Sequence, residues 1–95
     1  MNQQQMQIQI KANDEELKGR YANVVQIMHN PEEFALDFFL ALSPSGQLVS
    51  RILMSPGHMK RLARVLEENI RKYEEITGQK VEEAIEPKAI GFKAN

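Results

Sequence analysis

The sequence predicts an α+β fold, in which an antiparallel meander of three to four strands precedes one long amphipathic α-helix. Apolar residues recur at every second position in segments rich in β-branched and aromatic side chains, which is typical of strands. A Ser-Pro-Ser-Gly turn separates two such segments, and one later stretch has apolar residues three and four positions apart, as in a helix. We expect strands at about 5–11, 21–29, 33–42 and 47–54, and a helix at about 56–77.

The first two expected strands differ in how they would be covered. Residues 5–11 alternate glutamine with Met6, Ile8 and Ile10, which indicates an edge strand or a half-buried one. Residues 21–29 carry apolar side chains at both odd and even positions, so we expect cover on both faces. The polar, acidic residues 13–19 that lie before this second strand are expected to form a connection.

The third expected strand follows a segment with two interpretations. Asn30-Pro31-Glu32-Glu33 has the capping residue, proline and acids of a helix start. Asparagine and proline also favour the first two positions of a type I turn. The apolar residues beyond Glu33 recur at every second position, and a partner strand follows at 47–54. We therefore expect a turn and then a central strand at 33–42.

The hairpin between the third and fourth strands predicts an ion pair. Ser43–Gly46 suits a type I turn followed by glycine in the left-handed conformation. This loop places Ser43 opposite Gln47. In that register Asp37 and Arg51 are diagonal neighbours on one face, within reach of a long side chain. We expect a structural ion pair there, although a carboxyl group in an apolar run is also a candidate general base.

The helix predicted at 56–77 has clear ends. Ser55 is a good N-cap, and Gly78 favours the left-handed conformation that ends helices. Its length of about 33 Å exceeds the roughly 23 Å of a seven-residue strand. We therefore expect Tyr73 and Ile76 to contact a partner chain. The apolar face consists of Met59, Leu62, Leu66, Ile70, Tyr73 and Ile76.

The pattern divides the chain into a single α+β domain at 1–78 and a C-terminal tail at 79–95. The tail is acidic and then interrupted by proline, and we expect it to be partly flexible or docked on a partner chain. Ile90 and Phe92 alternate near its end and are further candidate contacts in an oligomer.

The composition argues against several function classes. With 12 basic and 13 acidic residues the net charge is −1, so no global field attracts nucleic acid or an anionic membrane. The absence of cysteine excludes disulfides and zinc–thiolate sites. The N-terminus lacks a signal-peptide pattern, and no segment approaches the roughly 20 apolar residues of a membrane span. We expect a cytoplasmic protein with no membrane partner.

No catalytic or metal-binding motif is present in the sequence. His29 and His58 are the only histidines, and they lack the spacing of metal ligands. Ser55 has no base placed to activate it, and capping explains its position. The loop Ser43–Gly46 lacks the lysine of a phosphate-binding loop. We expect no catalytic residue, no cofactor and no metal, and hence no enzyme.

The first turns of the expected helix are basic, through Lys60, Arg61 and Arg64. Cations oppose the helix dipole, whose positive end lies at the N-terminus. One interpretation pairs them with acids such as Glu32, Glu33 or the tail of a partner. The other is a contact with an anion or with nucleic acid, although few aromatic side chains are available for stacking on bases.

Several short motifs in residues 18–78 occur together in a characteristic order. They are Gly19-Arg20-Tyr21-Ala22-Asn23, Pro31-Glu32-Glu33-Phe34, Leu36-Asp37-Phe38, Arg51, Ser55-Pro56, His58, Lys60, Asn69 and Tyr73-Glu74. In combination they resemble a small family of uncharacterised prokaryotic proteins, the domain of unknown function numbered 3467. This resemblance implies no activity, ligand or site residue, but it favours an extended conformation at 33–42. The order of strands and helix is also similar to that of SecB-type export chaperones, at the level of the fold only.

These observations favour a non-enzymatic, homo-oligomeric interaction or adaptor protein. Its exposed strand and helix surfaces would contact another copy and a protein partner, and a chaperone-like binder of client proteins is a variant of this hypothesis. The alternative is a small dimeric nucleic-acid-binding protein that uses the basic first turns of the helix.

Overall fold

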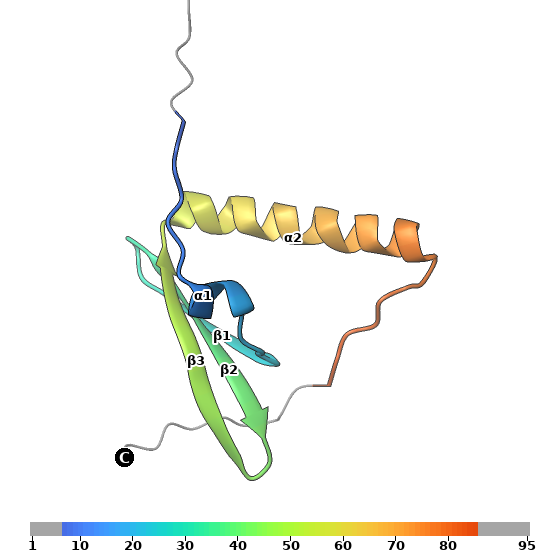
Figure 1. The fold of residues 1–95 in the computed structure, drawn as a ribbon, viewed down its shortest axis with the longest axis horizontal. Helices are drawn as coiled ribbons and strands as arrows, with labels where there is room; N and C mark the ends of the chain where they lie inside the picture. Colours follow the sequence, from blue (N-terminus) through green and yellow to red (C-terminus); the bar gives the residue numbers. More distant parts are fainter. Residues whose placement is uncertain (1–6, 86–95) are drawn as a thin grey trace, which may run out of the picture.

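The computed structural model describes residues 7–85 and contains one sheet and two helices (Figure 1). The short helix α1 covers Asp14–Lys18. The sheet follows, with strands β1 (Val24–His29), β2 (Phe34–Leu42) and β3 (Ser45–Met54). Each strand pairs antiparallel with the next, in the order β1-β2-β3, and the long helix α2 (Pro56–Thr77) comes last. The predicted α+β meander with a long C-terminal helix is confirmed.

β2 is the central strand, as the alternating pattern predicted. The chain reaches it through a turn in which the Asn30 side-chain oxygen accepts hydrogen bonds from the backbone N–H groups of Glu32 and Glu33, at 2.8 and 2.9 Å. The asparagine thus satisfies backbone donors in a turn rather than starting a helix. Leu36 and Phe39 of β2 are buried. The helical interpretation of this segment is wrong.

The register of the β2–β3 hairpin differs from the predicted one. The turn contains only Ser43 and Pro44, joined by a cis peptide bond, so Leu42 pairs with Ser45. β3 then carries one extra residue, Val49, in a β-bulge that moves the register by one position. A two-residue turn and a bulge together replace the expected three-residue loop. As a result Asp37 lies directly opposite Arg51 instead of diagonally to it.

Gly46 has a different role from the expected left-handed turn position. It lies within β3, opposite Ala41. A Cβ atom on Gly46 would stand 3.2 Å from both the Ala41 Cα and the Leu40 carbonyl oxygen. The glycine is therefore needed for the close approach of two backbones, not for a positive φ angle.

Two expectations for the N-terminal part are wrong. The described part of the segment 5–11, residues 7–11, forms no strand, because its alternating residues have no strand beside them; Ile8 and Ile10 are exposed. β1 is an edge strand, and only Val24 on it is buried, so it is not covered on both faces. The polar connection contains α1, where the Asn13 side chain accepts a hydrogen bond from the Glu16 N–H at 2.9 Å.

The core of the described residues is small. Register places Leu36 on one face of the sheet and Val24, Asp37 and Phe39 on the other. These four are the buried residues within 7–85, and one of them is a carboxylate. A core of this size leaves most of the apolar side chains of the strands and of α2 at least partly accessible.

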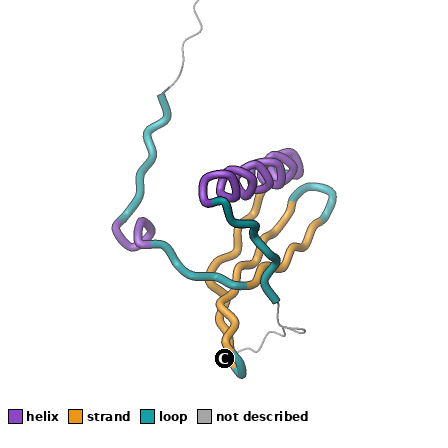
Figure 2. Tube along the Cα trace, turned by 90° about the vertical axis from the view of Figure 1, so that its right-hand side faces the viewer, coloured by secondary structure: helices purple, strands orange, loops and turns teal. Residues whose placement is uncertain are grey.

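α2 has the bounds that its capping residues predicted. The Ser55 hydroxyl oxygen accepts a hydrogen bond from the His58 N–H at 3.2 Å. At the other end Gly78 adopts the left-handed conformation with φ 70°, and its N–H donates to the Glu74 carbonyl oxygen at 2.9 Å. Figure 1 shows α2 leaving the end of β3 and running beyond the strands. Figure 2 views it nearly along its axis, with the strands on one side only.

Residues 79–85 follow α2 without regular secondary structure. Their path starts with a contact back to the helix, because the Val81 N–H donates a hydrogen bond to the Glu74 carboxylate at 2.9 Å. Ile90 and Phe92, the expected oligomer contacts of the tail, lie outside the described residues. Neither helix in the described range has the length and apolarity to cross a lipid bilayer.

The side chain of Asn23 extends the sheet beyond the first residue of β1. Its amide donates to the Ala41 carbonyl oxygen at 2.9 Å and accepts from the Ala41 N–H at 2.8 Å. We expect Asn23→Ala to lower the free energy of unfolding by about 1 kcal/mol, because both hydrogen bonds are lost at an exposed position. Urea unfolding measures this change.

The control is the same substitution in α2, Asn69→Ala. Asn69 donates a hydrogen bond to a carbonyl oxygen of its own helix, that of Val65. Alanine has the higher helix propensity, so this variant is expected to lose no stability. Equal losses in the two variants would contradict the assigned role of Asn23.

Candidate interaction surface

The second half of α2 carries a row of apolar side chains that the described residues 7–85 leave exposed. It consists of four residues, spaced by three and four positions and hence on one face, which we call the α2 stripe. Their exposed fractions are 55% for Leu66, 49% for Ile70, 50% for Tyr73 and 86% for Ile76. Continuous exposed apolar patches of this kind mark interaction sites on soluble proteins.

The α2 stripe lies in the half of the helix that is farther along the chain from β3. Met59 and Leu62, in the first half of the same apolar face, are half-buried. The second half of the helix extends beyond the strands, as Figure 1 shows. The end of the helix is nevertheless well fixed, since the Thr77 hydroxyl donates to the Tyr73 carbonyl oxygen at 2.9 Å. The structure therefore presents Tyr73 and Ile76 on an ordered helix.

The sheet adds further exposed apolar side chains. Val25 and Ile27 of β1 and Ile52 of β3 are exposed on the face that carries Leu36. β1 and β3 are the two outer strands of the sheet in the described residues. The outer edge of such a strand has backbone groups available to pair with another chain.

Asp37 and Arg51 form an ion pair within the sheet. The Arg51 Nε lies 2.6 Å from one Asp37 carboxylate oxygen, and its Nη2 lies 2.7 Å from the other. Asp37 has no exposed surface, whereas the Arg51 side chain is about half exposed. Two parallel hydrogen bonds of this kind give a guanidinium–carboxylate pair its strength and its fixed geometry.

The pair sets the protonation state of Asp37. The hydrogen bonds from Arg51 lower the pKa of the Asp37 carboxyl group below its ordinary value, and they outweigh the burial that would raise it. The same interaction raises the pKa of Arg51. At neutral pH Asp37 is an anion with both oxygens engaged. A carboxylate with a lowered pKa is a weak base, so this geometry favours the expected structural ion pair over a general base.

The basic first turns of α2 remain largely unpaired. Arg64 forms an ion pair with Glu68 on the same helix at 2.7 Å. Within residues 7–85 neither Lys60 nor Arg61 forms an ion pair. Neither Glu32 nor Glu33 forms an ion pair with α2 within the described residues, so the expected pairing with these acids is absent there. Pairing with the tail of a partner stays a prediction. The basic side chains border a shallow depression of about 410 Å³.

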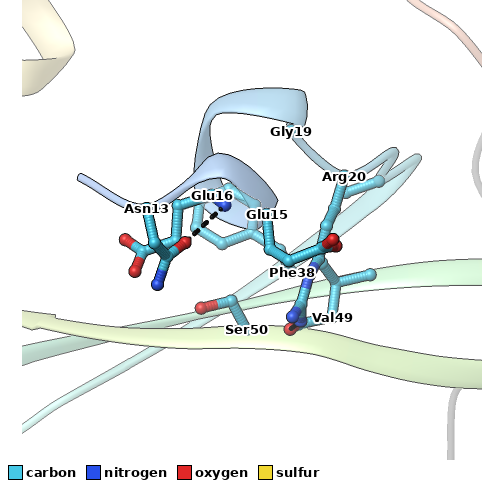
Figure 3. Close-up of a pocket in the computed structure, with 9 residues that line it drawn as sticks. Asn13, Glu15, Glu16, Gly19, Arg20, Phe38, Val49 and Ser50 are labelled. Atoms are coloured by element: carbon cyan, nitrogen blue, oxygen red, sulfur yellow. Dashed lines mark hydrogen bonds between the residues drawn. The ribbon is translucent and has the colours of Figure 1, made fainter.

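A second depression, of about 660 Å³, lies between α1 and the bulge of β3 (Figure 3). Across it the Arg20 guanidinium donates a hydrogen bond to the Val49 carbonyl oxygen at 3.1 Å. Phe38 and Ser50 line its floor, and Glu15 lies on α1 above them. In the described part of the chain every buried side-chain nitrogen or oxygen has a hydrogen-bond partner. The geometry thus ties the N-terminal segment to the sheet and presents no unpaired buried group to a ligand.

The two histidines are not brought together with acids. The His29 ring lies 5.2 Å from the Phe34 ring, centroid to centroid. His58 lies in the first turn of α2, where its N–H donates to Ser55. Among residues 7–85 no three His, Asp or Glu side chains are placed to hold a metal ion.

Two residues that organise this part of the molecule escaped the sequence analysis. Arg20 and Asn23 bind backbone groups of β3 and β2, at Val49 and Ala41 respectively. Both belong to the Gly19–Asn23 motif, which carries part of the family resemblance. These contacts could have been predicted from a guanidinium and an amide placed just before a strand, because side chains of this kind can satisfy backbone groups at the ends of a sheet.

We expect Arg51→Met to lower the urea midpoint strongly, because it leaves the buried Asp37 carboxylate without a partner. The double variant Asp37→Leu/Arg51→Met is expected to recover most of the loss, since apolar replacements of a buried pair cost much less than removal of one partner. A double variant no more stable than Arg51→Met would contradict this view of the pair.

The same pair predicts that the free energy of unfolding decreases at acid pH. Because the pKa of Asp37 is lowered on folding, its contribution is complete above the ordinary value of 3.8 and is lost as the pH falls through the lowered folded value. In Asp37→Asn that part of the pH dependence is expected to disappear. Urea titrations from pH 7 to below 3 test it; identical slopes in the wild type and the variant below pH 4 would contradict the assignment.

Comparison with known proteins identifies the family to which this architecture belongs. A family model described as "Protein of unknown function (DUF3467)" matches residues 1–80. This confirms the resemblance noted in the sequence and extends it to the first residue. No curated protein and no solved structure matches the chain. Since the match covers most of the chain, the protein is a member of the DUF3467 family.

Proposed function

We propose that this protein acts without catalysis, as a homo-oligomeric interaction or adaptor protein. Its exposed apolar surfaces bind a second copy and a protein partner. The observation that carries this proposal is the α2 stripe, in which Leu66, Ile70, Tyr73 and Ile76 stay about half exposed or more on a well-capped helix.

The free energy of burial favours association through this surface. Complete burial of a large apolar side chain stabilises by roughly 1.5–3 kcal/mol relative to full exposure. Side chains that are already about half buried gain a part of that amount, and a symmetric contact doubles the number of side chains involved. The α2 stripe alone therefore offers a substantial driving force for pairing.

A non-enzymatic role is supported by the use that the fold makes of its reactive groups. Asp37 is engaged by Arg51, and Ser55 caps α2. The His29 ring lies 5.2 Å from the Phe34 ring and is tilted by 38° relative to it. Each of these side chains has a structural partner, and none of them faces another as a nucleophile faces its base.

One observation favours the second candidate, binding of nucleic acid. Lys60 and Arg61 are exposed on consecutive positions of α2, and neither forms an ion pair within the described residues. Free cations on a helix suit contacts with phosphates. The net charge of −1 makes the electrostatic attraction weak, so this remains the alternative.

Purification of the native complex separates the candidate roles. One stoichiometric protein partner supports an adaptor, whereas a broad set of unfolded chains supports a chaperone-like binder. Nucleic acid that co-purifies, and a salt-dependent gel shift that Lys60→Glu/Arg61→Glu abolishes, would favour the alternative. Absence of any gel shift at low salt would exclude it.

We expect the wild-type protein to form a dimer or larger assembly in sedimentation equilibrium. Ile70→Gln is expected to weaken the assembly at least about tenfold, which corresponds to 1.4 kcal/mol, because it puts an amide in the centre of the α2 stripe.

Arg71→Gln is the matched control. It also introduces glutamine, one position further along the helix and outside the α2 stripe. This variant is expected to leave the assembly unchanged. Far-ultraviolet circular dichroism verifies that each variant keeps its helix. A wild-type protein that is monomeric at the highest concentration reached, or equal effects of the two variants, would contradict the proposal.

A further inference from the structure

We propose that α2 pairs antiparallel with α2 of a second copy, so that the basic half of each helix lies beside the acidic half of the other. The inference rests on the homo-oligomer proposed above and adds the partner, the orientation and the charges that select it. The occupant of the α2 stripe is thus a second copy of this chain.

The charges of α2 are separated along its axis. Residues 56–66 contain three basic residues and no acid, whereas residues 67–77 contain four acids and two basic residues. The first turn has no acidic residue and the last turn no basic one. This order opposes the helix dipole, which favours acids near the N-terminus and bases near the C-terminus. In an isolated helix the arrangement is unfavourable at both ends.

An antiparallel partner reverses the sign of these interactions. It places the acidic half and the negative dipole end of one helix beside Lys60 and Arg61 of the other. A parallel partner would place basic half beside basic half and acidic half beside acidic half. The distribution of charge therefore distinguishes the two orientations, and it complements a second copy without any other partner.

The charged residues beside the α2 stripe indicate which side chains would pair in the dimer. Lys60, Glu67 and Glu74 are spaced by seven residues, so they lie in a row beside the apolar face. When two such helices run antiparallel, each flank faces the same flank of the partner. Lys60 then lies level with the partner subunit's Glu74, twice per dimer. Glu67 lies near the two-fold axis, which is the one unfavourable position in the row.

The apolar side chains agree with this register to within two residues, or about 3 Å along the helix axis. The midpoint of the apolar face lies between Leu66 and Ile70, so a two-fold axis there places Leu66 beside the partner subunit's Ile70. Leu62 then lies at the level of the partner subunit's Tyr73. Exposed residues in the second half of each helix thereby meet the half-buried residues at the start of the other. The contact is self-complementary, as a closed dimer requires.

Exchange of the charges tests the inference in the full-length protein. Lys60→Glu and Glu74→Lys are each expected to weaken the dimer about tenfold, because each creates two like-charged pairs per dimer. The double variant Lys60→Glu/Glu74→Lys is expected to regain the wild-type dissociation constant. A mixture of the two single variants is expected to form the heterodimer in preference to either homodimer.

A second measurement is independent of charge. The chain has no cysteine, so single spin labels can be placed on the outer face of α2 at Arg61→Cys, Glu68→Cys or Glu75→Cys. In an antiparallel pair the labels at 61 and 75 are offset from their copies by about 20 Å along the axis, and the label at 68 is not. The distance between copies is therefore expected to be shortest at 68.

The outcomes separate this inference from the proposed function. A wild-type monomer would overturn both. A wild-type oligomer that is unaffected by Lys60→Glu and Glu74→Lys, or equal distances for the three labels, would overturn the antiparallel pairing and leave the oligomer in place. Circular dichroism shows whether each single variant is folded. If both are folded and their mixture forms no heterodimer, the antiparallel pairing is likewise overturned.

Discussion

The mismatch between the length of α2 and the size of the sheet is the constraint on which the rest of the structure depends. α2 has 22 residues, whereas the strands have between six and ten. Met59 and Leu62 in the first half of the helix are half-buried, whereas Leu66 and later residues of the same face are exposed. Within residues 7–85, neither the helix nor the sheet buries its apolar side chains completely. This geometry supports the proposed assembly.

Within the sheet, a charged pair lies at a core position where an apolar side chain is more usual. Asp37 is fully buried beside Val24 and Phe39 on one face, and its charge is balanced by Arg51 on the neighbouring strand. A buried carboxylate is tolerable only when both of its oxygens are satisfied. The pair therefore favours the register that places Asp37 opposite Arg51, and the Arg51 side chain stays about half exposed.

The elements with strong local signals could be predicted from the sequence. The bounds of α2 followed from Ser55 and Gly78, and the alternation after Glu33 identified β2. The hairpin register could not be predicted, because neither the two-residue turn nor the bulge at Val49 leaves a trace in the apolar pattern. Alternation at 5–11 was misleading, since a strand also needs a neighbour to pair with.

The central claim is that the second half of α2 is covered by another chain. Hydrogen exchange measured as a function of protein concentration tests it most directly, because amides in a helix exchange through local opening that association suppresses. The account predicts that protection of residues 66–77 rises with concentration, while protection of β2 stays the same. Protection of α2 that is independent of concentration over the same range would contradict it.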